Sequence, residues 1–323
     1  MSSDLISSPQ FSQISKNNRW SKGQENAKDR LAKGYTIPEW HQTFKLSTTD
    51  RIFTIGSCFA RNIEKALLLK KIKVSSANPN SDILELRTNL LTGLLNKYNP
   101  ISIHQELEWA SGHREFPSNG YINLENQYID PSLRNQSRKG NLDFVKNRKR
   151  LLQQYFSQCF TANCVIITLG LTETWVDLES HIALAETPSP RLLKEYPSRF
   201  ACKILSYSEC EKILNSIYLL LGKYGENKQR MIITVSPVPM ERTFSGQDIL
   251  VANLTSKSTL RAAAYAFAEK HTGVDYFPSY EAVTLAEPDI AWLHDRRTVK
   301  DGLVQEIMNR FIQAYELNDL ESP

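Results

Sequence analysis

Short apolar runs alternate along this chain with segments whose apolar residues recur every three or four positions. The runs RIFTIG (51–56), VIITLG (165–170) and MIITVSP (231–237) are continuously apolar and rich in β-branched residues, which is typical of strands buried on both faces. Two shorter runs, IKVSS (72–76) and VDYF (274–277), predict further strands. The pattern favours a mostly parallel sheet.

Amphipathic helices are predicted between these strands. NIEKALLL (62–69) places its apolar residues on one face. Ser208 followed by Glu211 has the spacing of a capping box and predicts where a second helix begins. A third helix is predicted after Thr255, and a last one carries apolar residues from 304 to 312. Strands and helices that alternate in this way predict an α/β domain with helices on both faces of the sheet.

The domain is expected to span residues 46–318, after a polar N-terminal arm of residues 1–45. The segment of about 98–142 is expected to be a loop-rich insertion. The arm lacks periodicity, which is typical of a disordered tail, but three aromatic residues provide groups that can hold it against the domain: Trp20, Tyr35 and Trp40.

Composition narrows the possible partners. The chain has 39 basic and 35 acidic residues, a net charge of +4, which is too small to indicate a nucleic-acid or membrane partner. No secretory signal and no apolar run of about 20 residues is visible, so a cytoplasmic protein is expected.

None of the five cysteines forms a CxxC pair, and no disulfide, metal or organic cofactor is expected. The oligomeric state is left open.

One segment, 134–150, is strongly basic. It can bind phosphate or an acidic glycan, or form the solvated face of a helix, and the second interpretation is favoured. Its basic residues are Arg134, Arg138, Lys139, Lys146, Arg148, Lys149 and Arg150.

Candidate chemistry gathers where the predicted strands end, because parallel sheets bind ligands at the carboxyl ends of their strands. Gly56 and Ser57 follow the first strand, where glycine permits a tight turn and the next helix favours a negative charge on the serine. Ser57 therefore suits a nucleophile, although a serine there can also cap the helix. Gly170, Thr172 and Glu173 follow the second long strand. Cys58 is interpreted as a small, unreactive thiol.

Two further groups of residues are candidates for a catalytic or anion-binding role. His294 and Asp295, late in a chain with an early serine, suit a Ser-His-Asp arrangement, although Asp295 can instead cap a helix or pair with an arginine. Lys257 and Arg261 are four residues apart near an expected helix start and repel each other unless an anion lies between them. An anionic substrate group or the carboxylate of Glu173 would each provide that anion.

Five separated blocks together resemble the signature of the GSCFA family, which is grouped with the SGNH (GDSL-like) hydrolases. The resemblance extends from about Arg51 to Tyr315. The blocks are GSCFA (56–60), ITLGLTETW (167–175), TVSPVPM (234–240), VANLTSKSTLRA (251–262) and DYFPSYEAVT (275–284).

The resemblance implies a flavodoxin-like three-layer α/β/α sandwich and ester chemistry. Ser57 would be the nucleophile, and its own N–H, Gly170 and Thr172 would form the oxyanion hole, with Glu173 in the place of the superfamily's aspartate. The substrate would be an acylated glycan or another small ester, in a setting of bacterial polysaccharide biosynthesis.

The end of the chain departs from the superfamily pattern. That pattern is Asp-x-x-His, whereas here Asp295 is followed by Thr298, and a threonine cannot accept a proton near pH 7. His294 is the expected substitute if the segment is helical, because residues four apart share a helix face. The alternatives are a serine esterase or O-acyltransferase with an atypical base, and a catalytically weakened relative that binds a glycan or a protein partner.

Overall fold

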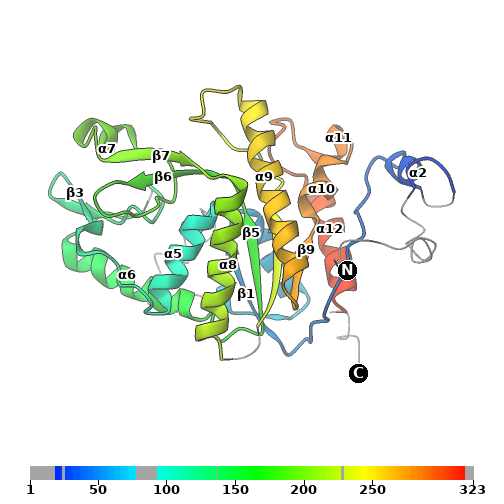
Figure 1. The fold of residues 1–323 in the computed structure, drawn as a ribbon, viewed down its shortest axis with the longest axis horizontal. Coiled ribbons are helices and arrows are strands. Elements are labelled where there is room, and N and C mark those ends of the chain that lie inside the picture. Colours follow the sequence, from blue (N-terminus) through cyan, green and yellow to red (C-terminus); the bar gives the residue numbers. More distant parts are fainter. Residues whose placement is uncertain (1–18, 24–25, 78–92, 136, 227–228, 317–323) are drawn as a thin grey trace, which may run out of the picture.

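The structure is a computed structural model that describes residues 19–23, 26–77, 93–135, 137–226 and 229–316. At its centre is a parallel sheet of five strands in the order β2-β1-β5-β8-β9 (Figure 1). The strands are β1 (Arg51–Gly56), β2 (Lys73–Val74), β5 (Cys164–Leu169), β8 (Arg230–Val235) and β9 (Val274–Phe277). All five predicted strands are confirmed, and their order is that of flavodoxin-like sheets.

Helices cover both faces of this sheet, which confirms the three-layer sandwich. Residues alternate along each strand, so Ile52, Ile166 and Ile232 pack on one face while Phe53 and Ile233 pack on the other. The first face is covered by α3 (Phe59–Leu69), α10 (Ser279–Thr284) and α12 (Asp301–Ala314). The second face is covered by α5 (Pro100–Ala110), α6 (Leu142–Ser157), α8 (Tyr207–Tyr224) and α9 (Ile249–Lys270).

Two antiparallel hairpins stand beside the main sheet. They are β3 (Ile122–Leu124) with β4 (Gln127–Ile129), and β6 (Glu173–Asp177) with β7 (Phe200–Ile204). They share a small core with α7 (Pro190–Glu195) that includes Ile122, Leu192 and Phe200. The segment 98–142 therefore contains a helix and a hairpin and is more regular than the loop-rich insertion expected.

Two predicted helix starts are wrong. Helix α8 is capped by Ser206 and Glu209, because Ser-x-x-Glu occurs twice in overlapping positions and the structure uses the earlier pair. Helix α9 begins at Ile249, with Asp248 as its cap, rather than after Thr255. The first turns of this helix expose three apolar residues, Leu250, Val251 and Leu254. Apolar residues on the exposed face hide the amphipathic pattern in this part of the helix.

The second half of the N-terminal arm packs on the domain. Trp40 lies edge-on to Phe277, with ring centroids 5.0 Å apart, and Tyr35 and Phe44 contact the same core. Trp20, in contrast, is 72% exposed. The remaining short helices are α2 (Ala27–Leu31), η1 (Ser75–Ala77), η3 (Ser118–Gly120) and α11 (Pro288–Ala291). Among the described residues, no helix is long and apolar enough to cross a membrane.

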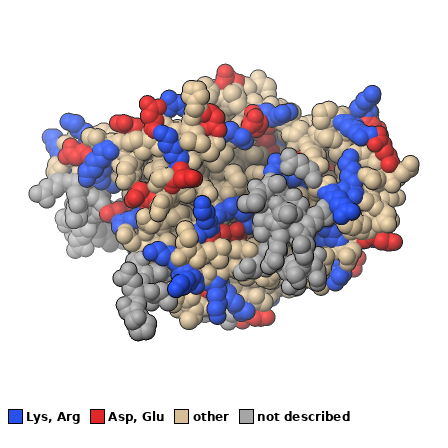
Figure 2. All heavy atoms as spheres, turned by 180° about the vertical axis from the view of Figure 1, so that it is seen from behind, with Lys and Arg blue, Asp and Glu red and all other residues tan. Residues whose placement is uncertain are grey.

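On the face shown in Figure 2, basic and acidic side chains are interspersed. In the basic segment, the favoured interpretation as a solvated helix face is wrong for Arg148 and Lys149, which are buried. Lys149 is drawn inward because its ammonium group pairs with Glu106 of α5.

Candidate active site

Ser57 lies at the carboxyl end of β1, on the turn that leads into α3. The turn needs glycine at position 56, where φ is +140° and a Cβ would lie 2.1 Å from the Thr168 carbonyl oxygen. The Ser57 side chain is almost fully buried, and its Oγ lies 3.2 Å from Thr168 Oγ1. Gly170 lies directly against it, since a Cβ on Gly170 would be 3.4 Å from the Ser57 Cβ.

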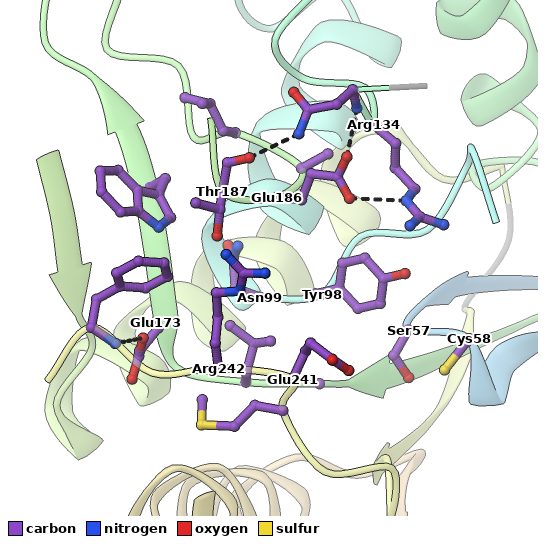
Figure 3. A pocket seen from close by; sticks show the side chains of 18 of the residues that line it. Ser57, Cys58, Tyr98, Asn99, Arg134, Glu173, Glu186, Thr187, Glu241 and Arg242 are labelled. Atoms are coloured by element: carbon purple, nitrogen blue, oxygen red, sulfur yellow. Dashed lines mark hydrogen bonds and ion pairs between the residues drawn. The ribbon is translucent and has the colours of Figure 1, made fainter. Parts of the chain in front are cut away.

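A pocket of about 630 Å³ opens at this edge of the sheet (Figure 3). Ser57, Gly170 and Ser236 follow three neighbouring strands and line it together. This edge is the switch point of the sheet, where open α/β folds bind their ligands. The other walls come from the loops after β6 and β8 and from the start of α5. Their polar and aromatic residues include Tyr98, Asn99, Arg134, Glu173, Trp175, Glu186, Glu241, Arg242, Phe244 and Arg297.

The three expected oxyanion-hole donors already have partners within the protein. The Ser57 N–H donates to the Thr168 carbonyl at 2.9 Å, and the Gly170 N–H donates to the Tyr98 carbonyl at 2.8 Å. The Thr172 hydroxyl faces Ser256, with 3.2 Å between the oxygens, and Thr172 does not line the pocket. In this conformation these donors do not form an oxyanion hole. The sequence could not indicate this, because Tyr98 reaches Gly170 from a loop 72 residues earlier in the chain.

His294 and Asp295 lie on an exposed turn and do not line the pocket. The turn is a tight hairpin rather than a helix, because Leu293 N donates to Thr298 O and Trp292 pairs with Val299. The helical geometry expected to carry His294 towards Ser57 is therefore wrong.

The Asp295 carboxylate is hydrogen-bonded within its own turn. Its carboxylate accepts hydrogen bonds from the Thr298 hydroxyl at 2.6 Å and from the backbone N–H groups of Thr298 and Arg297. These bonds lower the pKa of Asp295 to about 2. Asp295 is not a helix cap either, since α12 has Lys300 in that position. The structure does not bring the predicted serine, histidine and aspartate together.

Lys257 is buried in the middle of α9, behind the wall of the pocket. Its Nζ donates to the Gly170 carbonyl at 2.6 Å and to the Ser236 carbonyl at 2.8 Å. No carboxylate among the described residues forms an ion pair with it. Burial lowers the pKa of Lys257 to about 7.

The Glu173 carboxylate does not lie between Lys257 and Arg261. Arg261 turns away from the pocket and pairs with Glu281 at 2.9 Å. Glu173, the other suggested partner, accepts hydrogen bonds from the Thr243 hydroxyl and, at 2.9 Å, from the Phe244 N–H. Glu173 lines the pocket and holds the loop after β8 against it.

Most of the charges that line the pocket are neutralised within it. Arg134 pairs with Glu186 at 3.0 Å, and Arg297 pairs with Glu241 at 2.6 Å. Of these four residues, only Arg134 is marked in the sequence, as part of the basic segment. The others lie in irregular loops, where no periodicity marks them. No group of three or more potential metal ligands occurs among the residues that the structure describes.

A family model described as the GSCFA family matches residues 51–311. The chain belongs to the GSCFA family. No curated protein and no solved structure matches it. Membership of the wider SGNH group stays a prediction.

The GSCFA motif itself, residues 56–60, builds the turn between β1 and α3. Gly56 provides the required backbone conformation, and Phe59 and Ala60 are completely buried where α3 begins. Ser57 and Cys58, between them, are the two residues of the motif that line the pocket. Burial raises the pKa of the Cys58 thiol despite the nearby Lys257 and Arg297, so the thiol is neutral near pH 7.

Proposed function

We propose that this GSCFA protein is a serine-dependent esterase or O-acyltransferase that acts on an acylated carbohydrate. The observation that carries the proposal is the position of Ser57, at the switch point of the sheet and in the wall of a pocket large enough for a sugar. The aromatic ring of Tyr98 and the paired charges around it offer stacking and hydrogen bonds to a hydroxyl-rich ligand.

In the proposed reaction, Ser57 Oγ forms a bond to the acyl carbon and the sugar hydroxyl leaves with a proton. Water or a second hydroxyl then attacks the acyl-serine and restores the Ser57 hydroxyl. These two acceptors distinguish hydrolysis from transfer, and the same residues serve both.

The Ser57 proton needs an acceptor, and we assign that role to Lys257 rather than to His294 or Asp295. A pKa of about 7 suits a general base near neutral pH. A neutral amine that donates its two N–H groups to the Gly170 and Ser236 carbonyls keeps its lone pair free to accept a proton. Gly170 lies against Ser57, so the amine and the nucleophile flank the same residue.

A second candidate function is ligand binding without turnover. It is favoured by the engagement of the Ser57 and Gly170 amides in hydrogen bonds within the protein. The pocket would then hold a glycan or a protein partner, and Ser57 would be a buried structural residue.

Labelling with a fluorophosphonate probe, read by intact mass, separates the two candidates. The enzyme hypothesis predicts a single adduct on the wild-type protein that is lost in Ser57→Ala. Cys58→Ala is the matched control, since it changes the adjacent pocket residue and should keep the adduct. An adduct that survives in Ser57→Ala, or none on a folded wild-type protein, would contradict the proposal and favour binding.

A further inference from the structure

We infer that the pocket contains a site for an anionic oxygen group of the ligand, a carboxylate or a phosphate, formed by the side chains of Asn99 and Arg242. The inference deepens the proposed function, because it names a chemical feature of the substrate. It rests on different residues from those assigned to the acyl transfer.

Asn99 presents a fixed and unused hydrogen-bond donor. It is the cap of α5, and its Oδ1 accepts the Ser102 N–H at 2.8 Å. Because only the oxygen of the amide can accept that bond, the NH₂ group must face the other way. Asn99 is only 2% exposed and lines the pocket. Its NH₂ group has no hydrogen-bond partner among the described residues and is not shut off from the pocket.

Arg242 is the second donor. It lies on the loop after β8, and in Figure 3 its side chain extends across the pocket on the side of Tyr98 away from Ser57. No carboxylate among the described residues pairs with its guanidinium group. The other two arginines that line the pocket, Arg134 and Arg297, each have a glutamate partner.

The carboxylates of the pocket are already bound. Glu186 accepts from Arg134 and from the Asn135 N–H at 2.6 Å, and Glu241 is paired with Arg297. Glu173 is held by the Thr243 hydroxyl and the Phe244 N–H. No carboxylate of the pocket is therefore left for these two donors, and both are available to a ligand.

The donors themselves indicate the kind of group. An amide NH₂ and a guanidinium group only donate hydrogen bonds, so the matching group must be rich in acceptors. The positive end of α5 adjoins Asn99 and favours a negative charge there. A carboxylate or phosphate meets both conditions, and charge-assisted bonds to arginine are the stronger kind. We therefore expect an acidic sugar, such as a uronic acid, or a sugar phosphate.

The site is tested by calorimetric titration of the full-length protein with methyl glucuronide, methyl glucoside and inorganic phosphate. The glucuronide should bind roughly tenfold or more tightly than the neutral glucoside. Phosphate that binds more tightly than the glucuronide, and competes with it, would identify the anionic group as a phosphate. Equal affinity for the two glycosides, or no binding of either anion, would overturn the inference.

Two variants locate the site. Asn99→Asp keeps the cap of α5, because aspartate caps helices as well as asparagine, but it replaces the donor with a negative charge. Arg242→Gln removes the cation. Each should weaken binding of the anions roughly tenfold or more and leave the glucoside unchanged. The control is Arg150→Gln, which removes an equal charge from an exposed position of α6. Anion binding that persists in both variants would overturn the inference.

The calorimetric titration and the labelling experiment test the anion site and the acyl transfer separately. If the anions bind as expected but the wild-type Ser57 is not labelled, the acyl transfer is wrong and the anion site stands. If Ser57 is labelled but the two glycosides bind equally, the anion site is wrong and the acyl transfer stands.

Discussion

Two buried lysine sites flank the carboxyl edge of the sheet, and they differ in what surrounds the charge. In the first, Lys97 lies 2.7 Å from Glu106 and Lys149 lies 3.0 Å from the other oxygen of the same carboxylate. Asp130 is 3.9 Å from Lys149 and brings a second negative charge. In the second site, Lys257 has only two backbone carbonyls as partners.

The difference separates a structural ion cluster from a group that can titrate. Burial by itself raises the pKa of Glu106, but Lys149 and Lys97 outweigh it, so the pKa stays below its usual value and the carboxylate remains charged. Lys257 has no carboxylate partner, and burial lowers its pKa to about 7. Burial also lowers the pKa of Lys149, but Glu106 and Asp130 oppose that shift. The same type of residue is thus paired with carboxylates in one place and left to titrate near neutral pH in the other, because of its partners.

The ion cluster also positions the pocket. Lys97 precedes Tyr98 and Asn99 in the chain, and its backbone N–H donates to the Gly56 carbonyl at 2.8 Å. Its side chain ties this loop to α5 through Glu106. The ion cluster therefore holds the backbone that carries Asn99, the predicted anion-binding donor.

The largest expected effect on stability comes from breaking the ion cluster around Glu106. Glu106→Gln leaves two buried ammonium groups with one remaining carboxylate, and it should lower the free energy of unfolding by about 3–5 kcal/mol, measured by urea denaturation. Glu108→Gln, two residues along the same helix, is the control. Glu108 pairs with Arg114 and is partly exposed, so its loss should cost about 1 kcal/mol or less. Equal losses in the two variants would mean that the cluster is not the structural centre described.

Removing Lys257 should affect the chemistry more than the fold. Lys257→Met should slow fluorophosphonate labelling of Ser57 by about 100-fold or more, as expected for loss of a general base. The wild-type rate should rise with pH through about 7, because the neutral amine is the active form. A wild-type rate that is independent of pH between 6 and 8 would exclude Lys257 as the base.

Lys257 should also leave a signature in the pH dependence of stability. The unfolded chain keeps the lysine proton up to the usual pKa of 10.5, whereas the folded protein releases it near pH 7. Between these values the unfolded state binds more protons, so stability rises with pH, by up to about 1.4 kcal/mol per pH unit. This contribution should disappear in Lys257→Met, measured by urea denaturation from pH 7.5 to 9.5. The idea fails if the two proteins show parallel pH profiles.

Gly170 accepts a hydrogen bond from Lys257 and lies against Ser57, so a methyl group there should disturb both residues. In Gly170→Ala the new Cβ would lie 2.7 Å from the Tyr98 carbonyl oxygen, a backbone atom that cannot move aside cheaply. We expect a loss of about 1–3 kcal/mol in the free energy of unfolding and slower labelling of Ser57. The matched control is Gly222→Ala in α8, where nothing lies within 4 Å and the change should stabilise the helix by about 0.5–1 kcal/mol. A fully labelled, fully stable Gly170→Ala protein would contradict the tight contact.

The smallest effect is expected at an exposed lysine. Lys270, in the last turn of α9, pairs with Glu211 at the surface. Lys270→Gln should leave the free energy of unfolding and its pH dependence unchanged within the error of urea denaturation, because exposed ion pairs contribute little. A clear loss of stability would show that lysines of this protein matter regardless of their surroundings, and would weaken the contrast between the two buried sites.

By itself, the sequence was sufficient to predict the sheet, its helical layers and the place of Ser57. Strand and helix periodicities are local, and the GSCFA motif marks the turn after β1 within five residues. The capping box was misplaced by two residues because two overlapping serine–glutamate pairs satisfy the same local rule.

The chemistry of the pocket was decided by tertiary contacts. Lys257 was visible as a charge in the sequence, but its partners, Gly170 and Ser236, lie 87 and 21 residues away. His294 was adjacent to a suitable acid in the sequence, yet a hairpin keeps both residues on the surface. Local spacing determines which backbone forms a strand or a helix. Burial and contacts between distant segments determine which side chains lie near Ser57 and how their pKa values are shifted.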